Sequence, residues 1–384
     1  MPSISERDLA WAWWTCIQEP EDAHAHALRL HLGLIESIEW VCADSPGPLP
    51  PPLSQQRKTL EDAWKRFKPR ALRNDVNQEL AAIHALGGRF ISQEDPSFPK
   101  ELNILQESTP LGLWVRGTLP HTRSVTLVGA RATTNLGIRN AFDIASDLAD
   151  RGDTILSGGA FGIDIAAHRG TLAANGQTIA ILAGGVANPY PVSHTRDFET
   201  IVESSGAIVS EVPPSFRPAK WRFLGRNRML AAWGDATIVI EASSRSGALA
   251  TARRAMTLGK PVGAVPGPIT SQSSMGCHEL IRNGATLIRN ASDIHEMIDP
   301  LHTQLQGTLF GEPVCPDQGI NALSPHARRA WEALPIRTLS TLSNLAAHAG
   351  MSEQETLRAL AELELEGYVR SNSRGWARKG GARC

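Results

Sequence analysis

The segment 129-GARATTNLG-137 combines residue types that bind anions at the start of a helix. Gly129 permits a close turn of the backbone, and Arg131 carries a positive charge that does not titrate near neutral pH. Thr133 or Thr134 is placed to accept a hydrogen bond from the first turn of the following helix. The segment is therefore predicted to present an arginine beside a helix N-terminus, where phosphate groups bind readily.

A second segment, 157-SGGAFGID-164, has the glycine content of an anion cradle. Glycines leave backbone N–H groups accessible, and successive N–H groups at a helix start hold phosphate oxygens. Its candidate binding residues are Ser157, Gly158, Gly159 and Gly162. Asp164 is predicted to support the pocket by accepting hydrogen bonds from the loop backbone or from an arginine. An ion pair between Arg131 and Asp164 is the alternative to phosphate binding by Arg131.

The segment 243-SSRSGALAT-251 repeats this pattern of small polar residues at a predicted helix start. Ser246 and Gly247 are its candidate phosphate-binding residues. The segments 184-GGVANPYP-191 and 266-PGP-268 also follow predicted strands. One glycine loop is often only a tight turn, but together these loops favour a ligand that carries phosphate.

The run Arg226-Asn227-Arg228 adds two more arginines to the candidate site. One arginine is predicted to contact the ligand, and the other to pack against a carboxylate such as Glu211 or Glu241. Glu241 is therefore assigned to structural support of the pocket. No GxGxxG follows a strand and no GxxxxGK[ST] occurs, so the usual signatures of dinucleotide and ATP binding are missing. We expect the ligand to be a phosphodiester backbone, bound without a cofactor.

Short β-branched runs must position these segments, because each segment directly follows such a run. The runs are 124-SVTLVG-129, 154-TILSGG-159, 178-TIAILAGG-185, 207-AIVSE-211, 237-TIVIEA-242, 262-VGAVPG-267 and 286-TLIRN-290. Most lack alternation of apolar and polar residues, which is typical of strands buried on both faces of a parallel sheet. The stretches 137–152 and 247–259 are predicted to supply crossover helices. The predicted fold class is α/β, an extended Rossmann-like parallel sheet whose carboxyl strand ends bring the polar loops to one crevice.

Changes in composition divide the chain into domains. Residues 1–95 are predicted to form a helical N-terminal domain, interrupted by the proline-rich linker 46–52. Residues 96–299 hold the α/β domain, and residues 300–322 lose periodicity in the manner of a linker. Residues 323–379 show a helix-turn-helix pattern followed by a short strand and turn, which predicts a winged-helix domain.

Composition narrows the classes of protein to consider. Lys and Arg total 38 against 39 Asp and Glu, so any polyanion site must be a local patch. The 5 cysteines are scattered without metal-ligand spacing, which favours a reducing, cytoplasmic location and argues against a metal site or a disulfide framework. No apolar run reaches about 18 residues, so neither a membrane span nor a signal peptide is expected.

The order of the motifs resembles that of the DprA/Smf family of DNA-processing proteins. The motifs are GARATT, SGGAFGID, IAILAGGVANPYP, SEVPP, RNR, VIEASSRSGALATA, AVPGP and GCHELIRNGA, and the resemblance covers roughly residues 95–295. It implies a protein that binds single-stranded DNA in a basic pocket and forms a homodimer through the Rossmann-like domain. It also implies that the protein protects incoming DNA and loads the RecA recombinase onto it during natural transformation. The helical N-terminal domain, SAM-like in this reading, and the winged helix are similar to accessory domains of the family.

The resemblance also suggests roles for individual residues. The pocket would use Arg131, the loop from Gly158 to Gly162 and the arginines of 226–228. Arg196 lies where the family commonly has a basic residue, and Phe198 is a candidate stacking surface. No catalytic residue is implied. The winged helix is expected to contact duplex DNA or a protein.

A second function comes from a different class of protein. Similar Rossmann-like folds host N-glycosidases of nucleoside monophosphates, which need a glutamate in a glycine-rich loop at a helix start. The corresponding stretch here, 246-SGALATARR-254, offers arginines and no carboxylate. The enzyme is therefore the weaker hypothesis, and a binding protein without catalytic activity is the leading one.

Overall fold

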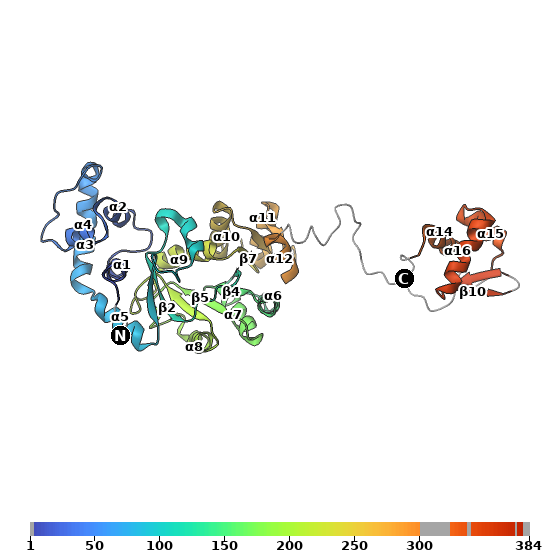
Figure 1. Ribbon diagram of the computed structural model, residues 1–384, viewed down its shortest axis with the longest axis horizontal. Helices are drawn as coiled ribbons and strands as arrows, with labels where there is room; N and C mark the ends of the chain where they lie inside the picture. The colour runs from blue at the N-terminus through green and yellow to red at the C-terminus, as the bar shows by residue number, and fades with distance from the viewer. Residues whose placement is uncertain (1–3, 300–322, 336–338, 373–374, 379–384) are drawn as a thin grey trace. The chain divides into compact units, whose positions relative to one another are not determined.

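The computed structural model describes residues 4–299, 323–335, 339–372 and 375–378 of the chain (Figure 1). The chain forms two compact units, Met1–Thr303 and Gln304–Cys384, each with its own apolar core. The predicted linker 300–322 lies outside the described residues.

The first unit is built on a nine-stranded sheet with the order β1-β2-β6-β5-β4-β3-β7-β8-β9. Its strands are β1 (Arg89–Ser92), β2 (Gly112–Gly117), β3 (Ser124–Val128), β4 (Thr154–Ser157), β5 (Thr178–Leu182), β6 (Ala207–Ser210), β7 (Ala236–Val239), β8 (Val262–Ala264) and β9 (Thr286–Leu287). Pairings from β6 through β9 are parallel, whereas β1 and β2 add an antiparallel edge beyond the predicted runs. Every run predicted to be a strand contains one, which confirms the α/β class and the largely parallel sheet.

The order of the strands in the sheet reverses at β3. From β3 the chain adds β4, β5 and β6 on one side, and then returns to place β7, β8 and β9 on the other. The loops that leave the carboxyl ends of β3 and β7 therefore turn away from each other. In open parallel sheets a crevice forms at such a point, and ligands bind there.

Helices cover both faces of this sheet (Figure 1). They are α6 (Asn135–Asp150), α7 (Ile163–Ala173), α8 (Thr195–Glu203), α9 (Lys220–Trp233), α10 (Gly247–Thr257), α11 (Met275–Arg282) and α12 (Ala291–Ile298), with 3₁₀ segments η2 (Lys100–Ser108), η3 (Val192–His194) and η4 (Gln272–Ser274). Side chains of α9 and α10 belong to one apolar core, and those of α6 and α7 to another. The strands are apolar on both sides because each side faces a helical layer.

The N-terminal helices pack against the antiparallel edge of the sheet. They are α1 (Glu6–Ile17), α2 (Ala23–Leu32), α3 (Leu34–Cys42), η1 (Leu53–Gln56), α4 (Arg57–Arg73) and α5 (Val76–Ala85). Their core is continuous with residues of the sheet, and the indole N–H of Trp114 on β2 donates to Thr15 Oγ1 on α1 at 3.2 Å. Strand β1 lies inside the range 1–95 that is expected to be helical, so the sheet begins earlier in the chain than residue 96.

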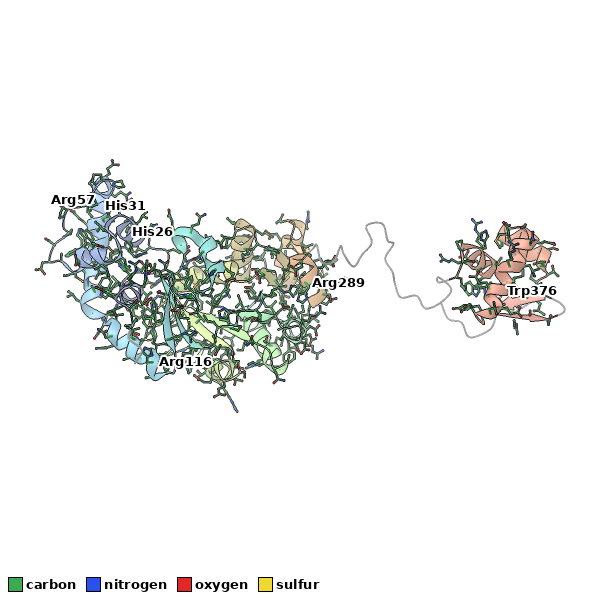
Figure 2. The ribbon with its side chains drawn as sticks, viewed as in Figure 1. His26, His31, Arg57, Arg116, Arg289 and Trp376 are labelled. Carbon is green, nitrogen blue, oxygen red and sulfur yellow. The ribbon has the colours of Figure 1, made fainter. Side chains whose placement is uncertain are left out.

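The second unit consists of three described helices and a hairpin. They are α14 (Pro325–Ala333), α15 (Leu342–Ala349), α16 (Glu353–Leu365), β10 (Val369–Asn372) and β11 (Gly375–Arg378). Ser352 caps α16 in a reciprocal capping box with Glu355. Trp376 lies on β11 (Figure 2) and packs against the core of the unit, while its backbone pairs with that of Ser340. The hairpin is thereby joined to the segment that precedes α15.

Candidate functional site

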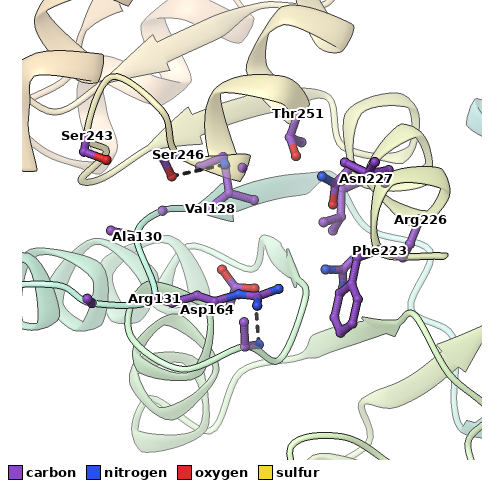
Figure 3. Close-up of a pocket in the computed structure, with 17 residues that line it drawn as sticks. Val128, Ala130, Arg131, Asp164, Phe223, Arg226, Asn227, Ser243, Ser246 and Thr251 are labelled. Carbon is purple, nitrogen blue, oxygen red and sulfur yellow. Dashed lines mark hydrogen bonds between the residues drawn. The ribbon is translucent and has the colours of Figure 1, made fainter. Parts of the chain in front are cut away.

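A cavity of about 420 Å³ opens at the carboxyl ends of β3 and β7 (Figure 3). Its lining residues are Val128, Gly129, Ala130, Arg131, Ala132, Ala160, Asp164, Phe223, Leu224, Arg226, Asn227, Leu230, Ser243, Ser246, Gly247, Ala248 and Thr251. The predicted segments 129–137, 157–164 and 243–251 therefore meet the run 226–228 at one place. This is the crevice at the topological switch point of the sheet.

Arg131 extends from the loop after β3 toward Phe223 on α9 (Figure 3). Its guanidinium carbon lies 5.0 Å from the centre of the Phe223 ring, a cation–π contact that orients the side chain. The residue is exposed, and no carboxylate in the described part of the chain lies within ion-pairing distance of it. Its charge and its N–H donors therefore face the cavity, where they can bind an anion by charge-assisted hydrogen bonds.

Arg226 has a different environment, although it also lines the cavity. It is buried and donates to the backbone oxygens of Gly158, at 3.0 Å, and Ile181. Burial lowers its pKa to about 10, while the nearby charge of Asp164 acts in the opposite direction. Arg226 is therefore positively charged at neutral pH and holds the glycine-rich loop against β5.

Asp164 supports this loop from the first turn of α7. It is buried, and its Oδ2 accepts a hydrogen bond from the backbone N–H of Ala160 at 3.3 Å. Burial raises the pKa of Asp164 above its ordinary value, and the charge of Arg226 opposes that rise. The Asp164 carboxyl group thus accepts a hydrogen bond from the loop and lies near the charge of Arg226. It does not form a close ion pair with Arg131.

The glycines of 157–164 shape the loop and do not line the cavity themselves. Gly159 has φ +77° and packs on the ring of Phe198, where a Cβ would lie 2.7 Å from a ring carbon. Gly162 has φ +82° and lies against the backbone of the loop after β3. Ser157 is fully buried and donates to Leu127 O at 2.6 Å. In this loop, Ala160 and Asp164 are the residues that reach the cavity wall.

Arg228 does not line the cavity; it is buried and forms an ion pair with the half-buried Glu211. Its Nη2 lies 2.5 Å from Glu211 Oε1, and its Nη1 lies 2.8 Å from Glu211 Oε2. Asn227, which lies between Arg226 and Arg228 in the sequence, lines the cavity. Ser246 caps α10 by accepting from Ala248 N at 3.3 Å, and Gly247 is exposed beside it.

Three further candidates lie outside the cavity wall. Arg196 is exposed on α8, and Phe198 on the same helix is fully buried, so its ring is not presented to a ligand. Glu241 is buried and accepts hydrogen bonds from the hydroxyls of Thr133 and Thr134, which secures the start of α6. The structure therefore gives Glu241 a supporting position.

The structure adds Phe223, Leu224 and Thr251 to the candidate residues. Phe223 precedes Arg226 by three positions in the sequence, so a helical reading of the RNR run would have placed both residues on one face. The loop 184–191 does not line this cavity, although Tyr190 lines an adjoining groove, and the loop 266–268 lines a separate cavity beside Glu241.

Within the described ranges, no group of three or more His, Cys, Asp or Glu side chains is arranged to hold a metal ion. None of the described helices is both long enough and apolar enough to cross a membrane.

The family model and the curated relatives that match this chain indicate one family. The family model described as DNA recombination-mediator protein A matches residues 89–299. The chain is 35% identical to a putative DNA processing protein DprA from Mycobacterium tuberculosis, over 96% of this chain and 93% of the relative. It is 33% identical to Protein Smf from Escherichia coli, over 80% and 81% of the two chains. The X-ray structure of DNA processing protein A from Streptococcus pneumoniae matches with a TM-score of 0.58 and 26% identity, and covers 76% of this chain and 98% of that one.

Proposed function

Because the chain belongs to the DprA/Smf family of DNA recombination mediators, we propose that its cavity at β3 and β7 binds the backbone of single-stranded DNA. One observation carries the proposal. Arg131 lines the cavity with an exposed guanidinium that has no ion-pair partner in the described part of the chain, and Arg226 adds a second, buried positive charge to the lining. Two such charges at a helix-rich crevice suit a phosphate group.

The shape of the site favours a single strand over a duplex. The cavity is lined by residues of the loops after β3, β4 and β7, of α9, and of the start of α7 and of α10, whereas duplex DNA is commonly read by an element that projects into one of its grooves. A single strand has a backbone that can follow such a crevice, with bases free to pack beside it. Binding of this kind carries little sequence information.

The finer proposals come from the family resemblance. The protein would protect incoming single strands and load the RecA recombinase onto them during natural transformation, acting as a homodimer through the α/β domain. The α14–α16 unit with its hairpin has the element order of a winged helix, and would contact duplex DNA or a protein. We also propose four parts for the chain. They are an N-terminal domain at 1–95, the α/β domain at 96–299, a linker at 300–322 and a winged-helix domain at 323–379.

We propose binding without catalysis. An N-glycosidase reading needs a carboxylate at the start of α10, and residues 246–254 contain none. Asp164 is the acid in the cavity lining, and its carboxyl group is engaged with Ala160 N and lies close to Arg226.

The test compares labelled oligothymidine with a blunt duplex of equal length. Tight single-strand binding is expected, and if about five phosphates are contacted, affinity should fall about a hundredfold between about 50 and 200 mM salt. Gly247→Glu should weaken binding at least about tenfold, because it adds a negative charge at the cavity wall.

A Cβ at Gly247 meets no atom within 4 Å, and a carboxylate at the first residue of α10 suits the helix dipole, so this variant should fold. Ala250→Glu makes the same charge change at an exposed position of α10 outside the lining and should bind normally. Equal affinity for duplex and single strand would overturn the proposal. Release of base from a nucleoside monophosphate would establish the enzyme instead.

A further inference from the structure

A separate cavity of about 170 Å³ lies between the carboxyl ends of β7 and β8 and the first turns of α6. It shares no lining residue with the cavity of the proposed DNA site. Its lining combines one carboxylate, that of Glu241, with hydroxyl, amide and apolar side chains. We call it the Glu241 cavity.

Glu241 uses one of its two oxygens and leaves the other unsatisfied. The residue is only 5% exposed. Its Oε2 accepts hydrogen bonds from the hydroxyls of Thr133 and Thr134, and from Thr134 N at 3.0 Å. Its Oε1 is buried and has no hydrogen-bond partner among the described residues. An unsatisfied buried carboxylate oxygen is costly, so it marks a place for a donor.

The Glu241 carboxylate is ionised and lacks a counter-charge. Burial acts to raise its pKa, but the nearby donors of Ser273, Thr133 and Thr134 outweigh burial and lower the pKa. The Ser273 hydroxyl forms its own hydrogen bond with that of Ser271, at 2.8 Å. The cavity lining contains no Lys, Arg or His, and no ion pair in the described part of the chain involves Glu241. Because buried charges are normally paired, the missing partner is a cation.

The rest of the lining suits an organic cation better than a bare metal ion. Val265, Pro266 and Pro268 provide apolar walls on which methylene groups can pack. Ser274 is 5% exposed and its hydroxyl bonds to no other described residue, so it offers a second polar contact. A volume of about 170 Å³ also exceeds what one water molecule or one ion needs.

We propose that the Glu241 cavity binds a small organic cation, whose ammonium or guanidinium group pairs with Glu241 Oε1 and whose carbon chain packs on the proline walls. A free amine carries such a group, and so does a Lys or Arg side chain of a protein. The proposal does not depend on the proposed function, because the two cavities share no residue.

Calorimetric titration of the full chain with N-butylguanidinium tests the proposal, at constant ionic strength. The wild-type protein should bind it with a Kd of about 1 mM or tighter, whereas N-butylurea, which has a similar shape without the charge, should bind at least about tenfold more weakly. Glu241→Gln keeps an acceptor for the two threonines and removes the charge. It should weaken N-butylguanidinium binding at least about tenfold.

Leu136→Lys tests the same cavity without changing the carboxylate. Leu136 lines the cavity and is 53% exposed, so this variant should fold and bring a tethered ammonium group to the rim. The tethered charge should weaken N-butylguanidinium binding at least about fivefold. Ile138→Lys makes the same charge change at a position of α6 that is 42% exposed and outside the lining, and it should bind as the wild type does. If Glu241→Gln fails to fold, this pair of variants still decides the question.

A capped arginine, N-acetylarginine methylamide, separates the two sources of the cation. Binding of both compounds supports the side chain of a protein as the occupant, and binding of N-butylguanidinium alone supports a free amine. Absence of wild-type binding of N-butylguanidinium at about 10 mM would overturn the proposal. Equal binding by the wild type, Glu241→Gln and Leu136→Lys would also overturn it, as would equal weakening by Leu136→Lys and Ile138→Lys.

Discussion

At the scale of single residues, the arginines near the cavity have separate roles because their surroundings differ. Arg131 is exposed and rests on an aromatic ring, so its donors face the cavity. Arg226 donates hydrogen bonds to backbone oxygens of the glycine-rich loop and of β5. Arg228 is paired with Glu211. Removing each charge should therefore have a different result.

Arg131→Ala should weaken single-strand binding by about 1–3 kcal/mol and make the salt slope shallower by about 0.7, the share of one phosphate. Arg131→Lys should recover only part of the affinity, because an ammonium keeps the charge but loses the planar fork. The melting temperature should stay near that of the wild type, since the guanidinium has no carboxylate partner in the described residues. A large loss of melting temperature with normal affinity in the folded fraction would show a structural role instead.

Arg228→Met should act in the opposite way. It leaves the half-buried carboxylate of Glu211 without its partner, so the free energy of unfolding should fall by about 3–5 kcal/mol. Urea unfolding measures this loss, and titration of the folded fraction at low denaturant should give wild-type affinity. The double variant Arg228→Met with Glu211→Leu should regain part of the stability. A stable Arg228→Met protein with weak DNA binding would contradict this assignment.

At the scale of elements, the turn after α1 connects the N-terminal helices to α9, the helix that carries Phe223 and Arg226. Glu19 accepts hydrogen bonds from Arg222 at 2.9 Å and from Trp221 at 3.1 Å on α9, and from Arg70 at 2.6 Å on α4. Burial acts to raise the pKa of Glu19, but these partners outweigh it and lower the pKa to about 2. The Glu19 carboxylate thus links α4, one of the N-terminal helices, to α9, which packs on the sheet.

Glu19→Gln should destabilise the first unit by about 1–3 kcal/mol at pH 7. The pKa of Glu19 is lowered on folding, so its contribution is complete above the ordinary value of 4.5 and is lost as pH falls toward about 2. The difference between wild type and variant should therefore be full at pH 7 and shrink below about pH 4.5, as measured by urea unfolding. Glu61→Gln, which breaks an exposed ion pair with Arg57, should change stability by less than about 1 kcal/mol. A difference that does not depend on pH would contradict the role of the Glu19 charge.

At the scale of the whole molecule, the proposed site belongs entirely to the first unit. Every residue that lines the cavity lies between 128 and 251. The α14–α16 unit has its own core, which includes Leu345, Leu360 and Leu363. The two units should therefore fold independently.

A chain truncated after Asp299 should remain folded and bind oligothymidine within about threefold of the full chain. It keeps the ion pair of Asp299 with Arg123, whose Nη1 lies 2.6 Å from Asp299 Oδ2, and Arg123 also holds Asp153. Circular dichroism and titration of the same sample test the prediction. Loss of single-strand binding in a folded truncated protein would place the site outside the first unit.

Local sequence determined the strands and the loops that follow them. Buried parallel strands have continuous β-branched runs, and helix starts have small polar residues, so β3 to β9 and the loop of Arg131 could be recognised without tertiary contacts. The order of the motifs was also enough to indicate the family. These features depend on neighbours in the chain, which is why a sequence reveals them.

Tertiary structure alone decided which side chains face the ligand. Arg226 and Arg228 are two positions apart on α9, and a helix turns about 100° per residue, so they must point to different sides; the sequence does not say which side faces the cavity. Phe198 is buried because α8 packs it against Gly159 and the apolar side chains of the sheet, although its sequence context suggests a stacking surface. Arg131 forms no close ion pair with Asp164, because that carboxyl group is held by the loop backbone near Arg226. Each outcome depends on contacts between segments far apart in the chain, and periodicity carries no information about those contacts.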